Sequence, residues 1–233
     1  MSEAFPAHTH GDDAVAVARH REDVMVGGVI VRHRFLSRFI HWSAAVAFIV
    51  SLLSGLPIWT PVFGCMAFLF GGLSVCRWLH PWAGAFFFIA SAGMFVHWAK
   101  EMVLKGREKE WLGPKMVAYL SFAGDDPTVG KYNGGQKILF WLTSLGAVGL
   151  GLSGLVLWFP DSLPQLLREA GILIHDMSFI AFVVVMIGHV YLGTAAEPGT
   201  FSAMTRGTVT KPWAKLHHPA WYREVTGDGD ERK

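Results

Sequence analysis

The sequence predicts an all-α integral membrane protein built as a bundle of four transmembrane helices. Hydrophobic residues make up 52% of the 233 residues and charged residues only 16%. The mean hydropathy is positive, and four apolar stretches, each of a length that fits one membrane crossing, are almost free of charge. This composition indicates that lipid, rather than water, surrounds most of the chain.

The first two predicted helices cover residues 40–59 and 80–103. The first ends at a proline-containing WTP turn, and the second begins where Pro81 suits the first turn of a helix. Between them lies a glycine-rich apolar segment, residues 62–79, which Gly71 and Gly72 interrupt and Arg77 closes. We interpret this segment as a loop or a partly embedded re-entrant segment rather than a further crossing.

The third and fourth predicted helices cover residues 138–159 and 172–195. Residues 105–135, before the third helix, are rich in charge and turn formers and are predicted to form an extramembrane loop. Glycines recur along the third helix, which favours close approach of neighbouring helices; they are Gly146, Gly149, Gly151 and Gly154.

The predicted domain organisation is simple. A polar N-terminal extension, residues 1–31, precedes a four-helix membrane domain, residues 32–225, and a polar tail, residues 226–233. The extension has a short apolar patch, Val24 to Val31, but no apolar run of the kind a cleavable signal needs. We assign it no role and expect it to contact a partner or to remain disordered.

The distribution of basic residues predicts the orientation. Of the 20 Lys and Arg residues, 18 lie before the first span, between Lys100 and Lys137, or after residue 196, whereas Arg77 and Arg168 lie on the other side. The positive-inside rule therefore places both termini and the 105–135 loop in the cytoplasm. The net charge of +2 hides this segregation and gives no indication of nucleic acid binding.

The two cysteines exclude several kinds of cofactor site in this chain. Cys65 and Cys76 are 11 residues apart, and the sequence contains no C-x-x-C or C-x-x-C-H motif. This removes iron–sulfur clusters, structural zinc and covalently bound haem, so any haem must be held noncovalently. We expect two unpaired thiols, although a disulfide stays open if the segment faces an oxidising compartment.

Five histidines fall within the predicted helices, where a polar, titratable ring is costly unless it is paired or binds a metal. They are His41, His80, His97, His175 and His189. For any one of them, a hydrogen bond to a neighbouring helix explains the ring equally well. Four more histidines are expected to be solvated on the polar extension: His8, His10, His20 and His33.

The depths of four histidines predict two haem sites. His175 and His189 are 14 residues apart on one helix, which is close to four turns, so both rings project from similar faces about 21 Å apart. Pairing by depth joins His80 with His175 on the outer side and His41 with His189 on the cytoplasmic side. Two noncovalent b-type haems with bis-histidine ligation suit electron transfer. Gly84 and Gly188 would leave room for the macrocycles.

Two alternatives stay open at this point. His97 lies 17 residues beyond His80, at the inner depth but turned by about 100°, and competes with His41 as an axial ligand; an interfacial or haem-propionate role suits it better. A hypothesis of a different class is that the chain is a haem-free membrane anchor, or a transporter in which the histidines relay protons.

Six segments together resemble the cytochrome b (gamma) subunit of membrane-bound respiratory formate dehydrogenase, over roughly residues 32–225. They are RFLSRFIHW, RWLHPWAG, GKYNGGQKILFW, ILIHDMSF, GHVYLG and WAKLHHPAWYRE. Each piece is short, and their order together with the C-terminal segment carries the resemblance. The related cytochrome b subunits of hydrogenase or thiosulfate reductase are the alternative within the same chemistry.

The resemblance implies the same haem ligands, His80 with His175 and His41 with His189. It also implies a quinone site, for menaquinone or ubiquinone, beside the inner haem at Asn133, Gly135 and His189. From the residues alone, the loop from Tyr132 to Gln136 is as well explained as an ordinary turn before a helix.

The function implied by the resemblance is electron transfer from periplasmic formate oxidation, across the membrane, to quinone. The chain would be the quinone-reducing subunit and would contain no catalytic residue for formate. An iron–sulfur beta subunit and a catalytic molybdenum or tungsten alpha subunit are the implied partners, and a higher-order oligomer is compatible with them.

Overall fold

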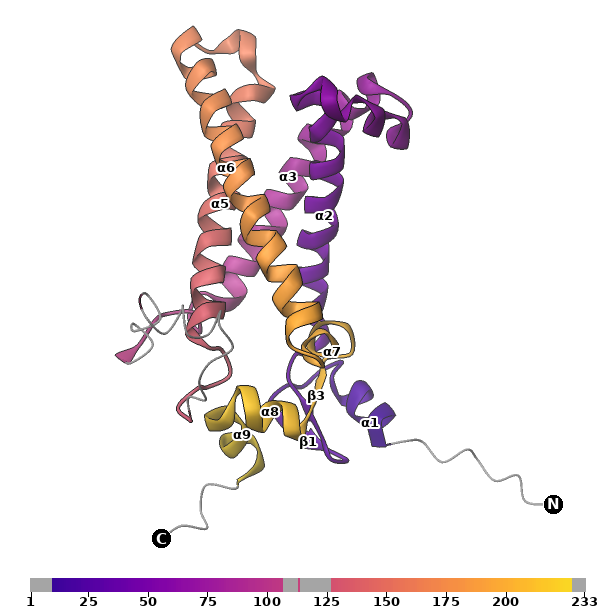
Figure 1. The fold of residues 1–233 in the computed structure, drawn as a ribbon, viewed down its shortest axis with the longest axis vertical. Coiled ribbons are helices and arrows are strands. Elements are labelled where there is room, and N and C mark those ends of the chain that lie inside the picture. Colours follow the sequence, from indigo (N-terminus) through magenta and orange to yellow (C-terminus); the bar gives the residue numbers. More distant parts are fainter. Residues whose placement is uncertain (1–9, 107–112, 114–126, 228–233) are drawn as a thin grey trace, which may run out of the picture. The chain divides into compact units, whose positions relative to one another are not determined.

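The computed structural model describes residues 10–106, 113 and 127–227, most of which are helical (Figure 1). The chain divides into two compact units. We call residues Phe39–Lys100 and Leu139–Gly188 the bundle unit. The end unit comprises the described parts of Met1–Arg38, Glu101–Ile138 and His189–Lys233.

Four long helices account for the predicted spans. They are α2 (Phe35–Trp59), α3 (Leu73–Trp98), α5 (Gly134–Trp158) and α6 (Gln165–Tyr191), the last continued by a π-helical turn, η4 (Leu192–Ala196). Among the described residues, these four helices are long and apolar enough to cross a membrane. The four predicted spans are therefore confirmed, although their bounds differ from the prediction by several residues.

The largest differences, seven residues each, are at the starts of the second and fourth spans. Helix α3 begins at Leu73, seven residues before the predicted start, so Arg77 and Pro81 lie inside the helix. The prediction that Pro81 marks the first turn is wrong because Gly71 and Gly72, both at positive φ, already end the preceding segment. A proline is tolerated within a membrane helix when neighbouring groups satisfy the carbonyl that it leaves free.

The segment between α2 and α3 is η1 (Pro61–Phe70), a ten-residue 3-10 helix that Thr60 caps at its start. It is too short to cross a membrane, as predicted. Cys65 is exposed and Cys76 is buried, and both are free thiols, which confirms the expectation for the cysteines. A short 3-10 turn, η3 (Pro160–Ser162), links α5 to α6.

Three phenylalanines from three helices form the centre of the bundle unit. The ring of Phe182 on α6 lies 4.9 Å from that of Phe48 on α2 and 5.5 Å from that of Phe87 on α3, between ring centroids. Ala47 and Ala147 are buried beside them. Packing of these rings, rather than any polar group, holds the middle of the bundle together.

The glycines of α5 allow its neighbours to approach, as predicted. A Cβ added at Gly146 would lie 2.6 Å from the ring of Phe182, and one at Gly149 would collide with Ser178, also on α6. Gly151 faces Phe88 of α3 in the same way. The helices therefore pack closely because these positions have no side chain.

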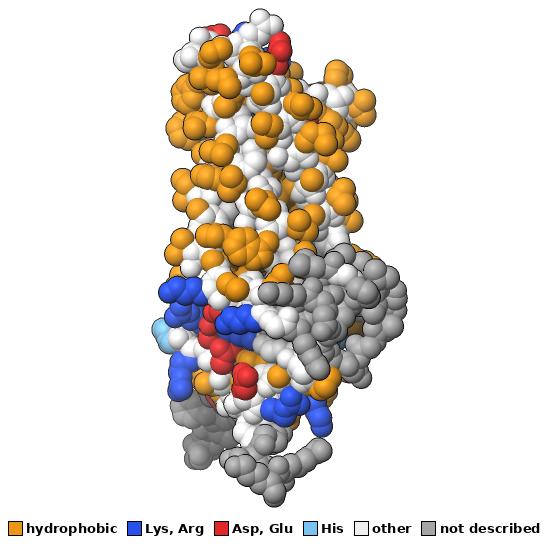
Figure 2. All heavy atoms as spheres, turned by 90° about the vertical axis from the view of Figure 1, so that its left-hand side faces the viewer, with side chains coloured by type: hydrophobic (Ala, Val, Ile, Leu, Met, Phe, Trp, Pro, Cys, Tyr) orange, Lys and Arg blue, Asp and Glu red, His pale blue; other side chains and the backbone are white. Residues whose placement is uncertain are grey.

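The outward surface of the bundle unit is apolar. Side chains such as Val96, Leu145 and Val184 are 81%, 68% and 64% exposed. Figure 2 shows hydrophobic side chains over the visible face of this unit. Such exposure is expected where lipid replaces water as the surrounding solvent.

The end unit contains a small antiparallel sheet, so the all-α prediction is wrong for this part. Its strands are β1 (Val24–Val26), β2 (Val29–Val31) and β3 (Thr208–Thr210), in that spatial order. Gly27 and Gly28, both at positive φ, make the two-residue turn between β1 and β2. The apolar patch that the sequence shows at residues 24–31 is therefore a hairpin.

The N-terminal extension packs against the C-terminal part of the chain. Helix α1 (His10–Val17) covers the hairpin, and β2 pairs with β3, placing Ile30 opposite Val209. Helices α7 (Thr200–Thr205), α8 (Lys211–His217) and α9 (Pro219–Thr226) complete the unit. The alternative that the extension remains disordered is wrong for residues 10–31, because its apolar side chains pack against other parts of the chain.

We expect Gly146→Ala to destabilise the bundle. The new methyl group meets a ring of Phe182 that is already fixed between Phe48 and Phe87, and overpacking of this kind costs about 1–3 kcal/mol. The measurement is the midpoint of thermal unfolding in detergent, followed by circular dichroism.

Gly93→Ala is the matched control, because its added Cβ makes an ordinary contact of 3.8 Å with Ile40. It should leave the midpoint unchanged or raise it slightly, since alanine favours helix. Equal losses in the two variants would contradict the packing explanation.

Candidate functional site

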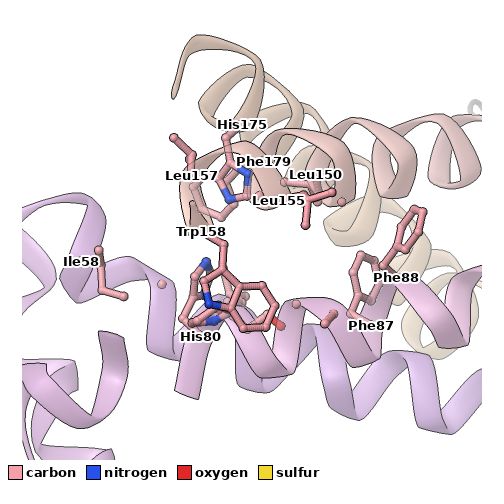
Figure 3. A pocket seen from close by; sticks show the side chains of 18 of the residues that line it. Ile58, His80, Phe87, Phe88, Leu150, Leu155, Leu157, Trp158, His175 and Phe179 are labelled. Carbon is pink, nitrogen blue, oxygen red and sulfur yellow. The ribbon is translucent and has the colours of Figure 1, made fainter. Parts of the chain in front are cut away.

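A cavity of about 690 Å³ lies within the bundle unit, between α2, α3, α5 and α6. Volumes of roughly 300–1,000 Å³ are typical of cofactor and ligand sites. His80 of α3 and His175 of α6 both line this cavity and point into it (Figure 3). The structure thus brings together the two histidines that the sequence paired on the outer side.

The two rings have the separation that one metal ion between them requires. Their centroids are 6.2 Å apart, and their planes are inclined by 81°. Metal–imidazole bonds are about 2 Å long, which puts the centroids of two axial imidazoles about 6 Å apart. The pair therefore fits a six-coordinate iron with one histidine on each side.

A hydrogen bond fixes the proton of His80. Its Nδ1 lies 2.9 Å from the backbone carbonyl oxygen of Ser51 on α2. A carbonyl can only accept, so Nδ1 carries the hydrogen and Nε2 keeps the lone pair that binds a metal. The Nδ1 of His175 is held in the same way, 2.9 Å from the Oγ of Ser153 on α5.

Glycines lie directly behind both rings. A Cβ at Gly55 would be 2.7 Å from a ring carbon of His80, and one at Gly154 would be 3.5 Å from a ring carbon of His175. Gly55 follows Ser51 by four residues, so both lie on the same face of α2. Ser51, Gly55 and Ser153 were not predicted from the sequence. The signal available for the first two was a serine and a glycine four residues apart, on the helix face opposite a histidine.

The rest of the cavity lining suits a large, flat, mostly apolar cofactor. Aromatic and aliphatic side chains dominate, among them those labelled in Figure 3. Arg77 and Asp176 are the charged residues of the lining, and Arg77 offers a positive charge to an acidic group at the edge of a cofactor. Gly84 also lines the cavity, as expected, with nothing within 4 Å of the position of its missing Cβ.

The other two histidines of the predicted pairs belong to different units. His41 lies near the start of α2 in the bundle unit, and His189 lies near the end of α6 in the end unit; both are half-buried. The pairing of His41 with His189 stays a prediction. His97 packs edge-on against Trp98 at the end of α3, and its competition with His41 stays open.

The predicted quinone loop begins α5 with a reciprocal cap. The Oδ1 of Asn133 accepts a hydrogen bond of 2.8 Å from the backbone N–H of Gln136, and the Oε1 of Gln136 accepts one of 3.0 Å from the N–H of Asn133. This is the arrangement of a capping box. Because Oδ1 is used, Asn133 can offer a ligand the two N–H groups of its amide.

A buried arginine holds the residues just before this cap. Arg32, which is 2% exposed, donates a hydrogen bond to the carbonyl oxygen of Lys131. Its guanidinium lies 4.9 Å from the ring centroid of Trp221 and 5.1 Å from that of Trp213. Burial lowers the pKa of Arg32 to about 10, while the nearby Tyr132 opposes that shift.

Two buried histidines contact the same stretch of chain. His218 lies with its Nδ1 2.7 Å from the carbonyl oxygen of Gly130, and its pKa is well below the usual value, first through burial and then through Arg32. His33 stacks on Tyr132 with 6.1 Å between ring centroids. His33 is 5% exposed, so the expectation that it is solvated is wrong.

Comparison with known proteins identifies the family. A family model described as "Prokaryotic cytochrome b561" matches residues 32–207. The chain belongs to the prokaryotic cytochrome b561 family. Membership implies a b-type haem. The volume and apolar lining of the cavity and the spacing of the His80 and His175 rings are compatible with such a group.

Three similar proteins carry more specific names. The "Formate dehydrogenase, cytochrome b556(fdo) subunit" of Escherichia coli strain K12 is 33% identical over 84% of this chain and 93% of its own length. The nitrate-inducible cytochrome b556(Fdn) subunit of the same strain is 30% identical over 84% and 92%. A formate dehydrogenase cytochrome b556 subunit of Haemophilus influenzae is 30% identical over 84% and 83%. The resemblance inferred from the sequence motifs is confirmed.

We expect Gly55→Ala to weaken haem binding at the cavity. The added methyl group would push the ring of His80 away from the carbonyl of Ser51, and loss of such an outer contact typically lowers metal affinity by about tenfold or more. Haem content per polypeptide, from the pyridine haemochrome spectrum, is the measurement.

Gly64→Ala serves as the control, since nothing lies within 4 Å of its missing Cβ and it lies outside the cavity. This control should keep its full haem content. A Gly55→Ala protein with unchanged haem content and unchanged spectrum would contradict the proposed contact.

Proposed function

We propose that this chain is the diheme cytochrome b subunit of a formate dehydrogenase and that it carries electrons across the membrane to a quinone. The facing pair of His80 and His175 in an apolar cavity is the observation that carries the proposal. Family membership and the names of the similar proteins support it. Haem b supplies reversible one-electron chemistry when bound.

The outer haem is assigned to His80 and His175. Their Nδ1 atoms are held by hydrogen bonds, so the Nε2 atoms are directed into the cavity as neutral ligands. The surrounding side chains are mostly aromatic and aliphatic, and the two histidines would fill both axial positions of a haem, with none left for oxygen. Filling both axial positions in this way favours electron transfer over oxygen activation.

The inner haem is assigned to His41 and His189. The support is the position of each ring near a helix end and the four-turn separation of His189 from His175 on α6. Two sites about 21 Å apart along the bundle would span much of a membrane about 30 Å thick.

The end unit is assigned to the cytoplasmic side of a bacterial inner membrane. The described parts of both terminal regions and of the connection between α3 and α5 belong to this one unit. Of the 20 Lys and Arg residues, 17 fall in the ranges of this unit, and Arg77, Lys100 and Arg168 fall in those of the bundle unit. The positive-inside rule therefore favours the cytoplasm for all three segments of the end unit. Much of the predicted 105–135 loop lies outside the described residues.

Quinone reduction is assigned to the cytoplasmic side, at Asn133, Gly135 and His189. The amide N–H groups of Asn133 can donate hydrogen bonds to a quinone carbonyl, because the capping box uses only its Oδ1. Proton uptake from the cytoplasm during quinone reduction, with electrons arriving from the outer side, would build a proton motive force. Menaquinone and ubiquinone both satisfy this chemistry.

Formate oxidation is assigned to other subunits. Among the described residues, no group of three or more His, Cys, Asp or Glu side chains is arranged to hold a metal ion. An iron–sulfur beta subunit and a molybdenum or tungsten alpha subunit would supply the electrons. A hydrogenase or thiosulfate reductase donor is the alternative, and the names of the similar proteins favour formate.

We expect the purified protein to contain two low-spin b-type haems and the histidine variants to remove them selectively. His80→Ala or His175→Ala should remove the outer haem, and His41→Ala or His189→Ala should remove the inner haem together with quinone reduction. Haem content and the reduced α band measure the result. Two low-spin haems retained in His41→Ala, but not in His97→Ala, would reassign the inner ligand to His97.

We expect formate to reduce both haems in the complex isolated with its partners. The α band should appear on addition of formate and disappear on addition of a quinone analogue. Copurified subunits identified by mass spectrometry provide the second measurement. Reduction by hydrogen but not by formate would assign the chain to a hydrogenase.

A further inference from the structure

We propose that Ser153 is a positioning residue for the haem ligand His175, and that its hydroxyl group lowers the reduction potential of the outer haem. The inference rests on the proposed function, because it requires a haem between His80 and His175. It adds Ser153 to the residues of the site, as a residue that would not touch the haem and would act through the ligand His175.

The hydroxyl of Ser153 accepts, rather than donates, the hydrogen bond to His175. Its Oγ lies 2.6 Å from the carbonyl oxygen of Gly149, one turn earlier on α5, and 2.9 Å from the Nδ1 of His175. A hydroxyl has one hydrogen, which the Gly149 carbonyl takes, so its lone pair faces the imidazole. Ser153 is 3% exposed, so water does not compete for this bond.

The opposite proton arrangement is incompatible with a ligand. If Ser153 donated to Nδ1, the hydrogen of the neutral imidazole would lie on Nε2, which then could not bind iron. The carbonyl of Gly149 would also lose its bond from the serine. Iron binding and the serine–carbonyl bond therefore require the same arrangement, in which His175 donates to Ser153 and Ser153 donates to the carbonyl of Gly149. Each hydrogen bond in such a chain polarises the next.

The partner ligand is held differently. His80 donates to the backbone carbonyl of Ser51, and the hydroxyl of Ser51 bonds to the carbonyl of Ala47 at 2.8 Å. Ser51 and Ser153 are both buried and both bond within their own helix, yet Ser153 alone of these two contacts its histidine through its side chain. Removal of the Ser51 hydroxyl leaves the bond to His80 intact, which makes Ser51 a matched control.

The effect on potential follows from the electron density on the ligand. An acceptor at Nδ1–H makes the imidazole a stronger electron donor, which stabilises ferric over ferrous iron and lowers the potential. Removing the acceptor should raise the potential. The carbonyl oxygen of Leu150, 3.3 Å from the Oγ of Ser153, is a second acceptor for the serine hydrogen, and with either carbonyl the lone pair of Oγ stays available to His175.

The experiment compares Ser153→Ala, Ser153→Thr and Ser51→Ala in the intact complex. Optical redox titration measures the potential of each haem, and electron paramagnetic resonance of the ferric protein reports the angle between the axial imidazole planes. The haem that His175→Ala removes identifies the outer signal. The hydrogen bond from the ligand of a ferric haem is stronger than that from the ligand of a ferrous haem, and this difference is smaller than the whole bond. We therefore expect the reduction equilibrium constant of the outer haem to rise by up to roughly tenfold in Ser153→Ala.

Ser153→Thr keeps a hydroxyl and should restore the potential and the resonance spectrum, and Ser51→Ala should resemble the unmodified protein. Loss of the outer haem in Ser153→Ala, with recovery in Ser153→Thr, would also support a positioning role. An unchanged potential and spectrum in Ser153→Ala, or equal changes in Ser51→Ala, would overturn the proposal. Failure of the proposed function itself would appear differently, as unmodified protein without haem.

Discussion

Lipid offers no hydrogen bonds, and this constraint organises the bundle unit. Each polar group inside it must find its partner on a helix: Ser51 and Ser153 bond to their own helices, and the two histidines bond across to α2 and α5. These contacts use one nitrogen of each imidazole and leave the other for a metal. Because burying an unpaired polar group is costly, both histidines are hydrogen-bonded, and these bonds leave a pair of oriented neutral ligands facing one cavity.

Much of the bundle could be predicted from the sequence because burial in lipid leaves a strong signal. The four spans follow from apolar length, and the pairing of His80 with His175 follows from the cost of an intramembrane ring and from the depth at which each histidine lies. The start of α3 could not be predicted in this way, because the backbone geometry of Gly71 and Gly72 sets it, rather than Pro81. The contact to His80 was also hidden, since Ser51 makes it through its backbone carbonyl, which every residue has.

The end unit was poorly predicted for a different reason. Its strands are three residues long, too short for an alternating pattern to stand out, and its core joins Ile30 to Val209 from opposite ends of the chain. The loop before α5 is shaped by contacts with Arg32 and His218, which lie 99 and 88 residues away in the sequence from the residues they contact. Local patterns contain no information about such pairings, so His33 was expected to be solvated and the hairpin was not predicted.

The sheet also has a consequence for how the protein is made. Strand β2 belongs to the first part of the chain to be synthesised, whereas β3, its partner, follows the last membrane helix. One edge of the apolar hairpin therefore stays unpaired until all four helices have been synthesised. Unpaired strand edges promote association with other chains. Closing the sheet would be a late step in assembly, and it would join the two ends of the chain only after the membrane helices are complete.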